Sequence, residues 1–280
     1  MKAKLLTSAS LLAIAGVTVS QLIPSVALAQ QKGKNLELTL VSYAVTRSAY
    51  EKIIPKFVAK WKKDKGQTVT FKQSYAGSGT QTRAVIDGLD ADVVQLALES
   101  DVNKIQQAGL IKPGWQKEAP NNGIVTKSVI ALVTRPGNPK KIKGWSDLAR
   151  ADVKTVTANP KTSGVARWNF MGLWGSVTQS GGNEAKARAF TTKVYNNVPV
   201  LPKDAREASD VFYKQNQGDV LLNYENEILL AKAKGETEPY IIPPVNISID
   251  APVAVVDKNA DKKQYLRQTR GWFRQQEWDV

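Results

Sequence analysis

Two hydrophobic periods alternate along most of this chain. Residues 36–42 form an apolar run typical of a strand. In residues 50–61 the apolar positions recur three and four residues apart, which is typical of an amphipathic helix that Pro55 should kink. The same alternation of strand and helix continues downstream. It predicts an α/β fold in which helices flank mainly parallel sheets.

The remaining elements fall into two series. In the first we expect strands at 68–71 and 92–98 and helices at 80–87 and 101–108, the last ended by Gly109. A strand at 128–134 and a Pro/Gly-rich loop at 135–139 lead to the second series. This series has strands at 154–157 and 219–222 and helices at 165–174, 184–195, 205–216 and 225–234. A strand at 246–256 returns to the first series. The sequence therefore predicts two lobes, with residues 30–127 and 247–280 in lobe I and residues 128–246 in lobe II.

The N-terminus has the pattern of an export signal. Lys2 and Lys4 precede an apolar run that ends near residue 19, and Ala27-Leu28-Ala29 provides a small-x-small cleavage signal. Polar residues interrupt the run, so it is too short for a transmembrane anchor. We predict a signal peptide at residues 1–29, with the mature chain released into the periplasm as a soluble monomer.

Missing residue types exclude much catalytic chemistry. The 280-residue chain has no His and no Cys, which removes Ser-His-Asp triads, Cys-His pairs, and thiolate or imidazole metal sites. No phosphate-binding glycine motif follows a predicted strand. Glu225 and Glu227 are two residues apart on a predicted helix, so we expect them to point apart as surface or first-turn carboxylates. We predict no enzyme activity, no metal and no cofactor.

The net charge of +14 first suggests an acidic partner. A nucleic-acid binder gathers such charge on one face among stacking aromatics, whereas here the lysine runs at 60–65, 140–143 and 232–234 are dispersed. We interpret them as solvated faces and predict no nucleic-acid partner. A positive field still raises the arrival rate of a small anion.

Small or donor residues stand where predicted strands pass into helices. They occur at 42–44, 76–79, 162–165 and 204–206. The first turn of a helix has free backbone N–H groups and the positive end of the helix dipole, so it stabilises an anion without a charged side chain. Several such junctions together predict an anion-binding site.

The junctions also carry specific motifs. Ser74-Tyr75-Ala76-Gly77-Ser78-Gly79 resembles a motif of the sulfate-binding proteins of ABC transporters, as do the segments at 84–89, 159–164, 166–169, 225–227 and 251–258. The resemblance covers residues 36–262 and is greatest to cyanobacterial members. It implies a two-lobed Venus-flytrap fold of type II that closes over one dehydrated sulfate. It also implies membrane permease subunits as partners and a role in sulfur assimilation.

The resemblance further implies which residues bind the anion. Backbone N–H groups come from Ala44, Ser78, Gly164, Val165 and Ala205, and hydroxyl groups come from Ser78 and Ser163. Tyr224 stands where the family has a Trp that donates through its indole. Family arginines near the site correspond to Arg167 and Arg206, as supporting charges rather than ligands.

Three ligand positions depart from the family pattern. Ala44 stands where the family has an Asp, and Val165 stands where it has a Gly. At both positions the implied donor is the backbone N–H group, which any of these residues provides. Tyr224 is the larger change, because a phenol hydroxyl can accept as well as donate a hydrogen bond. It leaves thiosulfate, molybdate, tungstate and phosphate open as alternative ligands.

The C-terminal segment, residues 263–280, differs from the family. Its apolar periodicity is poor, with Trp272, Phe273 and Trp278 in a polar context, where the resemblance implies a helix and about fifty more residues. We expect a frame-shifted, shortened lobe I. The alternatives are therefore a truncated, non-functional paralogue, an enzyme acting on a sulfate or phosphate ester, and a basic nucleic-acid or envelope-associated protein.

Overall fold

The computed structural model describes residues 35–262. The predicted signal peptide at 1–29 and the unusual segment at 263–280 lie outside the described residues. Within residues 35–262, no helix is long and apolar enough to cross a membrane.

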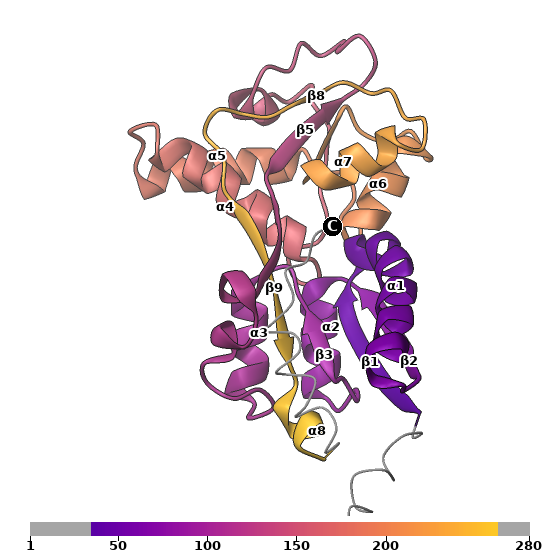
Figure 1. Ribbon diagram of the computed structural model, residues 1–280. Helices are drawn as coiled ribbons and strands as arrows, with labels where there is room; N and C mark the ends of the chain where they lie inside the picture. The colour runs from indigo at the N-terminus through magenta and orange to yellow at the C-terminus, as the bar shows by residue number, and fades with distance from the viewer. Residues whose placement is uncertain (1–34, 263–280) are drawn as a thin grey trace, which may run out of the picture.

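One part of the molecule, which we call lobe I, is built on a five-stranded sheet with strand order β2-β1-β3-β9-β4 (Figure 1). Its strands are β1 (Leu36–Tyr43), β2 (Val69–Ala76), β3 (Val93–Gln95), β4 (Ile124–Ser128) and β9 (Ile249–Val255). Its helices are α1 (Arg47–Lys65), α2 (Ser78–Ile86), α3 (Glu99–Gln107) and α8 (Asp257–Lys262), with short 3-10 helices η1 (Ala44–Thr46), η2 (Trp115–Glu118) and η3 (Pro120–Gly123). Helix α1 continues through Pro55 as one helix and buries Phe57 and Trp61.

The other part, lobe II, is built on a four-stranded sheet with strand order β6-β7-β5-β8. Its strands are β5 (Ile130–Thr134), β6 (Thr155–Val156), β7 (Val220–Tyr224) and β8 (Tyr240–Ile241). Its helices are α4 (Gly164–Thr178), α5 (Glu184–Asn196), α6 (Ala205–Tyr213) and α7 (Glu225–Lys232), with a 3-10 helix η4 (Trp145–Ala149). The two-lobed α/β fold predicted from the sequence is confirmed.

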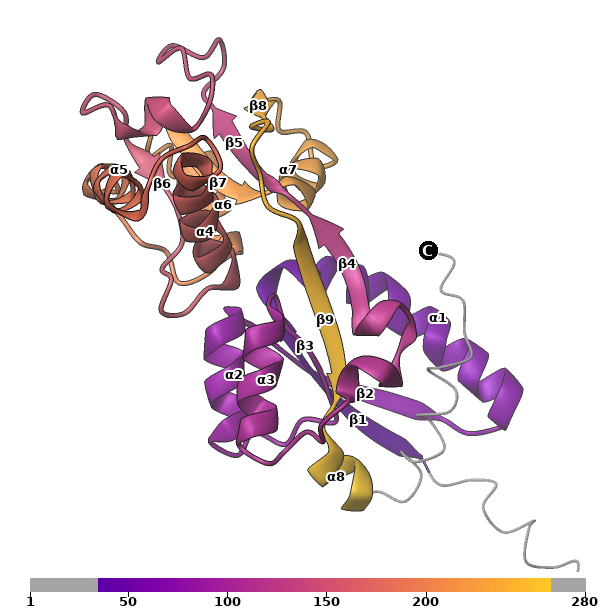
Figure 2. The same ribbon diagram turned by 90° about the vertical axis from the view of Figure 1, so that its left-hand side faces the viewer.

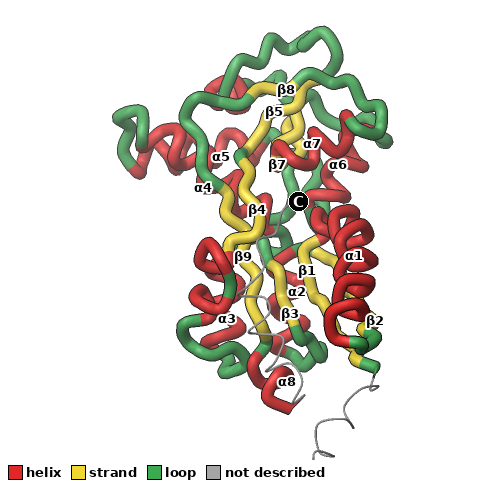
Figure 3. The backbone as a smooth tube through the Cα atoms, in the orientation of Figure 1, coloured by secondary structure: helices red, strands yellow, loops and turns green. Residues whose placement is uncertain are grey.

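Two chain segments join the lobes side by side. Strand β4 ends at Ser128 in the first sheet and β5 begins at Ile130 in the second, so the strand expected at 128–134 corresponds to β5, and β4 was not predicted. Strand β9 returns to lobe I and pairs with β4 in the antiparallel direction (Figures 2 and 3).

These connecting strands make both sheets mixed rather than mainly parallel. In lobe I, β1 pairs with β2 and β3 in parallel, whereas β9 runs antiparallel to β3 and β4. In lobe II, only β6 and β7 are parallel, because β5 enters from lobe I against the direction of β7. Two neighbouring strands are parallel when a crossover helix returns the chain to the same end of the sheet. A strand that enters directly from the other lobe has no such helix before it, so strand-helix alternation does not predict its direction.

The largest apolar cluster lies in lobe II and extends to the contact with lobe I. It includes Ile130 and Leu222 from the second sheet, and also Tyr43, Ala97 and Leu98 from lobe I. Two smaller clusters, one containing Val94 and Trp115 and the other containing Leu38, support the first sheet. The two lobes therefore pack against each other where the strands of lobe I end.

Candidate functional site

Several helices begin at the junction of the two lobes. Strands β1 and β2 are parallel and in register, with Tyr43 beside Ala76. Their carboxyl ends therefore lie together, and η1 and α2 begin directly after them. From lobe II, α4, α6 and α7 begin immediately after Ser163, Asp204 and Tyr224.

These helix starts surround one small cavity between the lobes, which we call the central cavity. It is lined by all seven residues that the sequence predicted as ligands: Ala44, Ser78, Ser163, Gly164, Val165, Ala205 and Tyr224. Tyr43, Val45, Gly77 and Asp204 complete the lining. The structure thus brings the predicted residues together, while their contacts with a ligand remain a prediction.

The central cavity is nearly closed. Its volume is about 10 Å³, the space for roughly one water molecule. A larger solute would enter only with the lobes apart, and the lining would separate slightly to seat it.

Backbone N–H groups at the helix starts are the main donors of the central cavity. The first turn of a helix has no intrahelical acceptors, and its dipole adds partial positive charge. In α2 the N–H groups of Gly79 and Thr80 donate to the carbonyl of Thr162 across the lobes, at 3.0 and 3.3 Å. Of these first three N–H groups of α2, the N–H of Ser78 is therefore the one left for the central cavity.

The two cavity serines differ in what their hydroxyl groups do. The Ser78 hydroxyl donates to Asp101 at 2.6 Å and accepts from the N–H of Ala97 at 3.0 Å, so its proton is already used. Ser163 precedes α4, yet its hydroxyl does not cap that helix, and the side chain is buried at the cavity. In this arrangement Ser163 has a hydroxyl proton free for the cavity, whereas Ser78 contributes its N–H.

Tyr224 has an unsatisfied hydroxyl at the central cavity. The residue is 2% exposed, and its hydroxyl has no hydrogen-bond partner among the described residues. Its ring packs edge-on against Tyr43, with centroids 6.2 Å apart. Burial raises the Tyr224 pKa well above the usual value, so the group stays protonated and can donate. A buried donor without a partner is costly, which points to a polar ligand here.

Each arginine near the central cavity is paired with a buried carboxylate. Arg167 forms a two-pronged pair with Asp101, which is fully buried, with one N–O distance of 2.6 Å. Arg206 contacts Glu227 at 3.0 Å. Both arginines were predicted as supporting charges; Asp101 compensates Arg167, and Glu227 compensates Arg206 to the extent that it is ionised.

Glu227 is the clearest departure from the sequence prediction. We expected a surface or first-turn carboxylate, and it does lie in the first turn of α7, but it is only 3% exposed. Burial raises the Glu227 pKa from 4.5 to about 7, and the nearby Arg206 opposes this shift. The expectation of a surface position was wrong, because α7 turns this side chain toward Arg206 and the protein interior.

Contacts across the lobes hold the central cavity shut. Besides the Arg167–Asp101 pair, the indole of Trp168 donates to the carbonyl of Ala97 at 2.9 Å, and Arg83 donates to the carbonyl of Lys161 at 3.0 Å. The backbones approach closely at Gly164, where a Cβ atom would lie 2.3 Å from the Cβ of Ala97.

Sequence reasoning missed the two buried acids and the glycine contacts. Asp101 and Arg167 are 66 residues apart and belong to different lobes, so no local spacing joins them. Gly77 was predicted only as a small residue at a strand–helix junction, and the structure adds that a Cβ there would lie 2.4 Å from the carbonyl oxygen of Thr162. Residues 35–262 contain no group of three or more His, Cys, Asp or Glu residues that could hold a metal ion.

Comparisons with known proteins agree with this geometry. A family model described as bacterial extracellular solute-binding protein matches residues 38–267. The sulfate-binding protein of Synechococcus elongatus is 67% identical over 82% of this chain and 65% of its own length. The chain thus spans slightly less than two thirds of that relative. The thiosulfate-binding protein of Pseudomonas aeruginosa is 38% identical over 84% of this chain and 71% of its own length.

A solved structure supports the same relationship. The sulfate-binding protein SubI from Mycobacterium tuberculosis H37Rv superposes with a TM-score of 0.73 and 32% identity, covering 84% of this chain and 86% of that one. The resemblance to sulfate-binding proteins, predicted from the motifs, is therefore confirmed.

Proposed function

This chain belongs to the bacterial extracellular solute-binding protein family, and from that premise we propose that it captures sulfate in the central cavity. It would then deliver the anion to the permease subunits of an ABC transporter. The observation that carries the proposal is the convergence of helix N-termini and free hydroxyl donors on one closed cavity whose neighbouring arginines are already paired.

The paired arginines decide how a dianion would be stabilised. Because Asp101 compensates the charge of Arg167, and Glu227 compensates part of the charge of Arg206 near pH 7, less than one net cationic charge remains beside the central cavity. Neutral donors and helix dipoles would then carry the interaction, and they act strongly because the closed cavity excludes water. Our proposed ligands are backbone N–H groups and two hydroxyls: the N–H groups of Ala44, Ser78, Gly164, Val165 and Ala205 and the hydroxyls of Ser163 and Tyr224.

A cavity of donors favours sulfate over phosphate. Near neutral pH sulfate carries no proton, whereas phosphate often carries one that must find an acceptor. A protonated oxygen facing only donors is left unsatisfied, which costs about 1–3 kcal/mol. The Ser163 and Tyr224 hydroxyls are the proposed ligands that could turn and accept, so they would set how strongly phosphate is rejected.

Thiosulfate is the second candidate. It is tetrahedral and unprotonated like sulfate, and a relative named thiosulfate-binding protein is 38% identical. Molybdate and tungstate share the geometry and remain alternative ligands of the same site.

We further propose export through the predicted signal peptide at residues 1–29 and action in the periplasm as a monomer. Lobe boundaries at residues 127/128 and 246/247 are part of the proposal. The first falls one residue before the end of β4 and the second in the segment that leads into β9, so both lie close to where the chain passes between the lobes. We assign no cofactor, enzyme activity or nucleic-acid partner.

The proposal can be tested by thermal unfolding with sulfate. If the protein binds sulfate, a concentration of about 1,000 times Kd stabilises it by about 4 kcal/mol and raises Tm by about 8 °C or more. Sodium chloride at equal ionic strength is the control. A cooperative transition that sulfate and thiosulfate leave unmoved would reject oxyanion binding, and a non-cooperative transition would favour the non-functional paralogue.

A further inference from the structure

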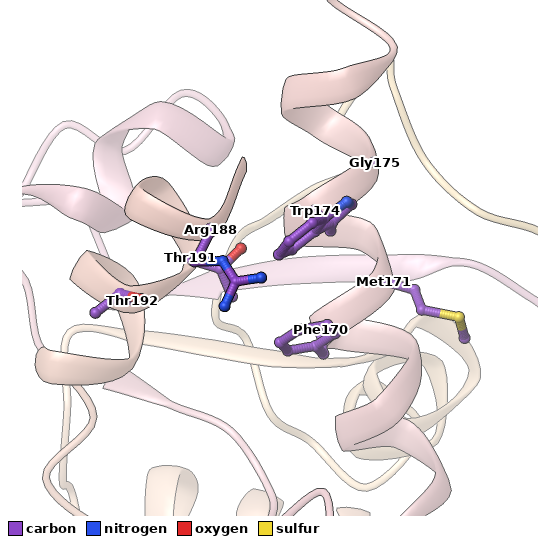
Figure 4. Close-up of a pocket in the computed structure, with 7 residues that line it drawn as sticks. All are labelled: Phe170, Met171, Trp174, Gly175, Arg188, Thr191 and Thr192. Carbon is purple, nitrogen blue, oxygen red and sulfur yellow. The ribbon is translucent and has the colours of Figure 1, made fainter. Parts of the chain in front are cut away.

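A second cavity lies between α4 and α5 on lobe II and shares no residue with the central cavity. We call it the α4–α5 groove (Figure 4). Its volume is about 530 Å³, enough for one or two large side chains. Helix α4 lines it with Phe170, Met171, Trp174 and Gly175, and α5 with Arg188 and Thr191.

Gly175 keeps this groove open without serving the protein's own packing. A Cβ atom at Gly175 would have no atom within 4 Å, whereas one at Gly172, in the same helix, would lie 2.5 Å from the Cδ1 of Ile130. Glycine inside a helix is unfavourable relative to alanine. Close packing therefore requires Gly172, whereas no packing contact within the described residues requires Gly175.

Apolar side chains are left uncovered beside this space. Phe170 and Trp174 stack with ring centroids 5.9 Å apart and planes 25° from parallel. Phe170 is 40% exposed and Met171 is 37% exposed. Figure 4 shows both rings on the side of α4 that faces Arg188. Trp, Phe, Met and Arg are the residues enriched at the centres of protein interfaces.

Two polar groups of α5 lack partners at the same place. Thr191 is only 4% exposed, and its buried hydroxyl has no hydrogen-bond partner among the described residues. Arg188 is exposed and forms no ion pair within residues 35–262. In Figure 4 both side chains lie opposite Trp174 across the groove.

We propose that the α4–α5 groove docks a segment of a partner protein that carries an acidic side chain next to a large apolar one. The apolar side chain lies on Phe170 and Trp174 above Gly175, and the carboxylate meets the exposed guanidinium of Arg188. The inference goes beyond the proposed function and does not depend on sulfate binding.

The test uses two model peptides and the full chain. Acetyl-Leu-Glu-Leu-Phe-amide and its Gln counterpart are titrated at millimolar concentration while NMR follows the backbone amide of Gly175 and the side-chain Nε–H of Arg188. We expect saturable shifts of both signals with the Glu peptide. Binding of the Gln peptide should be about three- to five-fold weaker, the contribution of an exposed ion pair.

Two variants make the test specific. Gly175→Leu fills the groove and should abolish the shifts, while Arg188→Gln should bind both peptides equally. Both variants should unfold cooperatively on heating, as the parent does, which shows that they fold. Arg188 is on the surface, so Arg188→Gln still tests the proposal if the leucine variant misfolds. The proposal would be overturned if the Gly175 signal did not move, or if the parent bound both peptides equally well. It would also be overturned if the shifts depended on protein concentration alone, because the groove would then bind a second copy of the chain.

Discussion

Helix α4 takes part in two contrasting regions. Its N-terminus borders the central cavity, where the neighbouring arginines Arg167 and Arg206 are paired with buried carboxylates. Farther along it borders the α4–α5 groove, where Arg188 is unpaired among the described residues and Phe170 is exposed. The difference follows from solvent. Water stabilises an unpaired charge on an open surface, whereas a closed cavity requires every charge to be compensated.

The comparison teaches how a site can receive a dianion without a free cation. Paired arginines leave the central cavity with neutral donors at the start of α4 and its neighbours, which suits a small, unprotonated anion. An exposed arginine beside stacked aromatic rings suits a larger partner with one negative charge.

The largest expected effect comes from the glycine at the cavity end of α4. In Gly164→Ala the new Cβ would lie 2.3 Å from the Cβ of Ala97 and 2.9 Å from the Cδ1 of Leu98, both in lobe I, so the lobes cannot close fully. We expect sulfate affinity to fall about 100-fold, because overpacking of this kind costs about 3 kcal/mol. Calorimetric titration measures the change.

Gly175→Ala, farther along the same helix, is the matched control: it makes the same substitution away from the central cavity and should leave sulfate affinity unchanged. The Gly164→Ala protein should still unfold cooperatively without sulfate, because alanine is a good helix residue and the clash lies between the lobes rather than within the core of either one. Unchanged affinity in Gly164→Ala would show that binding does not need this closure.

The second effect concerns the buried carboxylate of Glu227. Its pKa of about 7 in the folded protein lies above the unfolded value of 4.5. Between these values the native state holds a proton that the unfolded state has lost, so stability decreases as pH rises from 4.5 to 7, by up to about 3 kcal/mol. Urea unfolding at pH 5 and pH 7.5 should show this decrease in the parent and much less of it in Glu227→Gln. An identical pH dependence in both proteins would contradict the assigned burial.

A third effect tests the unpartnered hydroxyl of Tyr224. In Tyr224→Phe we expect sulfate affinity to fall about ten-fold, the value of a hydrogen bond to a charged group, without loss of stability in the free protein. The control is Tyr43→Phe, because the Tyr43 hydroxyl already contacts Thr126 at 3.4 Å. Calorimetry measures the sulfate affinity of both variants, and thermal unfolding measures their stability. Equal losses of affinity in both would show that ring packing, not the Tyr224 hydroxyl, matters.

The smallest effect is at the groove end of α4. Gly175→Ala should stabilise the protein by about 0.5–1 kcal/mol, because alanine is the better helix residue and its Cβ meets no atom within 4 Å. Urea unfolding measures the gain. A loss of stability would mean that this face of α4 is packed more tightly than the structure shows.

Much of the fold was predictable because it depends on local patterns. The helix starts at Ser78, Gly164 and Ala205 follow from small or capping residues after apolar runs, and the structure gathers them around one cavity. The directions of β4, β5 and β9 were not predictable, because pairing across lobes leaves no periodic signal in the sequence.

The charges of the site were the least predictable part. In the sequence, Asp101 and Glu227 look like ordinary first-turn residues of α3 and α7. In the structure both are buried, and each pairs with an arginine that is distant in sequence. Only the tertiary structure shows that they compensate Arg167 and Arg206. It also shows that the proton of the Ser78 hydroxyl is directed at Asp101.

The most direct test of the donor-lined cavity is a pair of calorimetric titrations at pH 7, one with sulfate and one with phosphate. A cavity built mainly from backbone N–H donors, in which only the Ser163 and Tyr224 hydroxyls among the proposed ligands can also accept, predicts that phosphate binds at least about ten-fold more weakly, since its proton is poorly matched there. Phosphate binding as tight as sulfate binding would contradict the account.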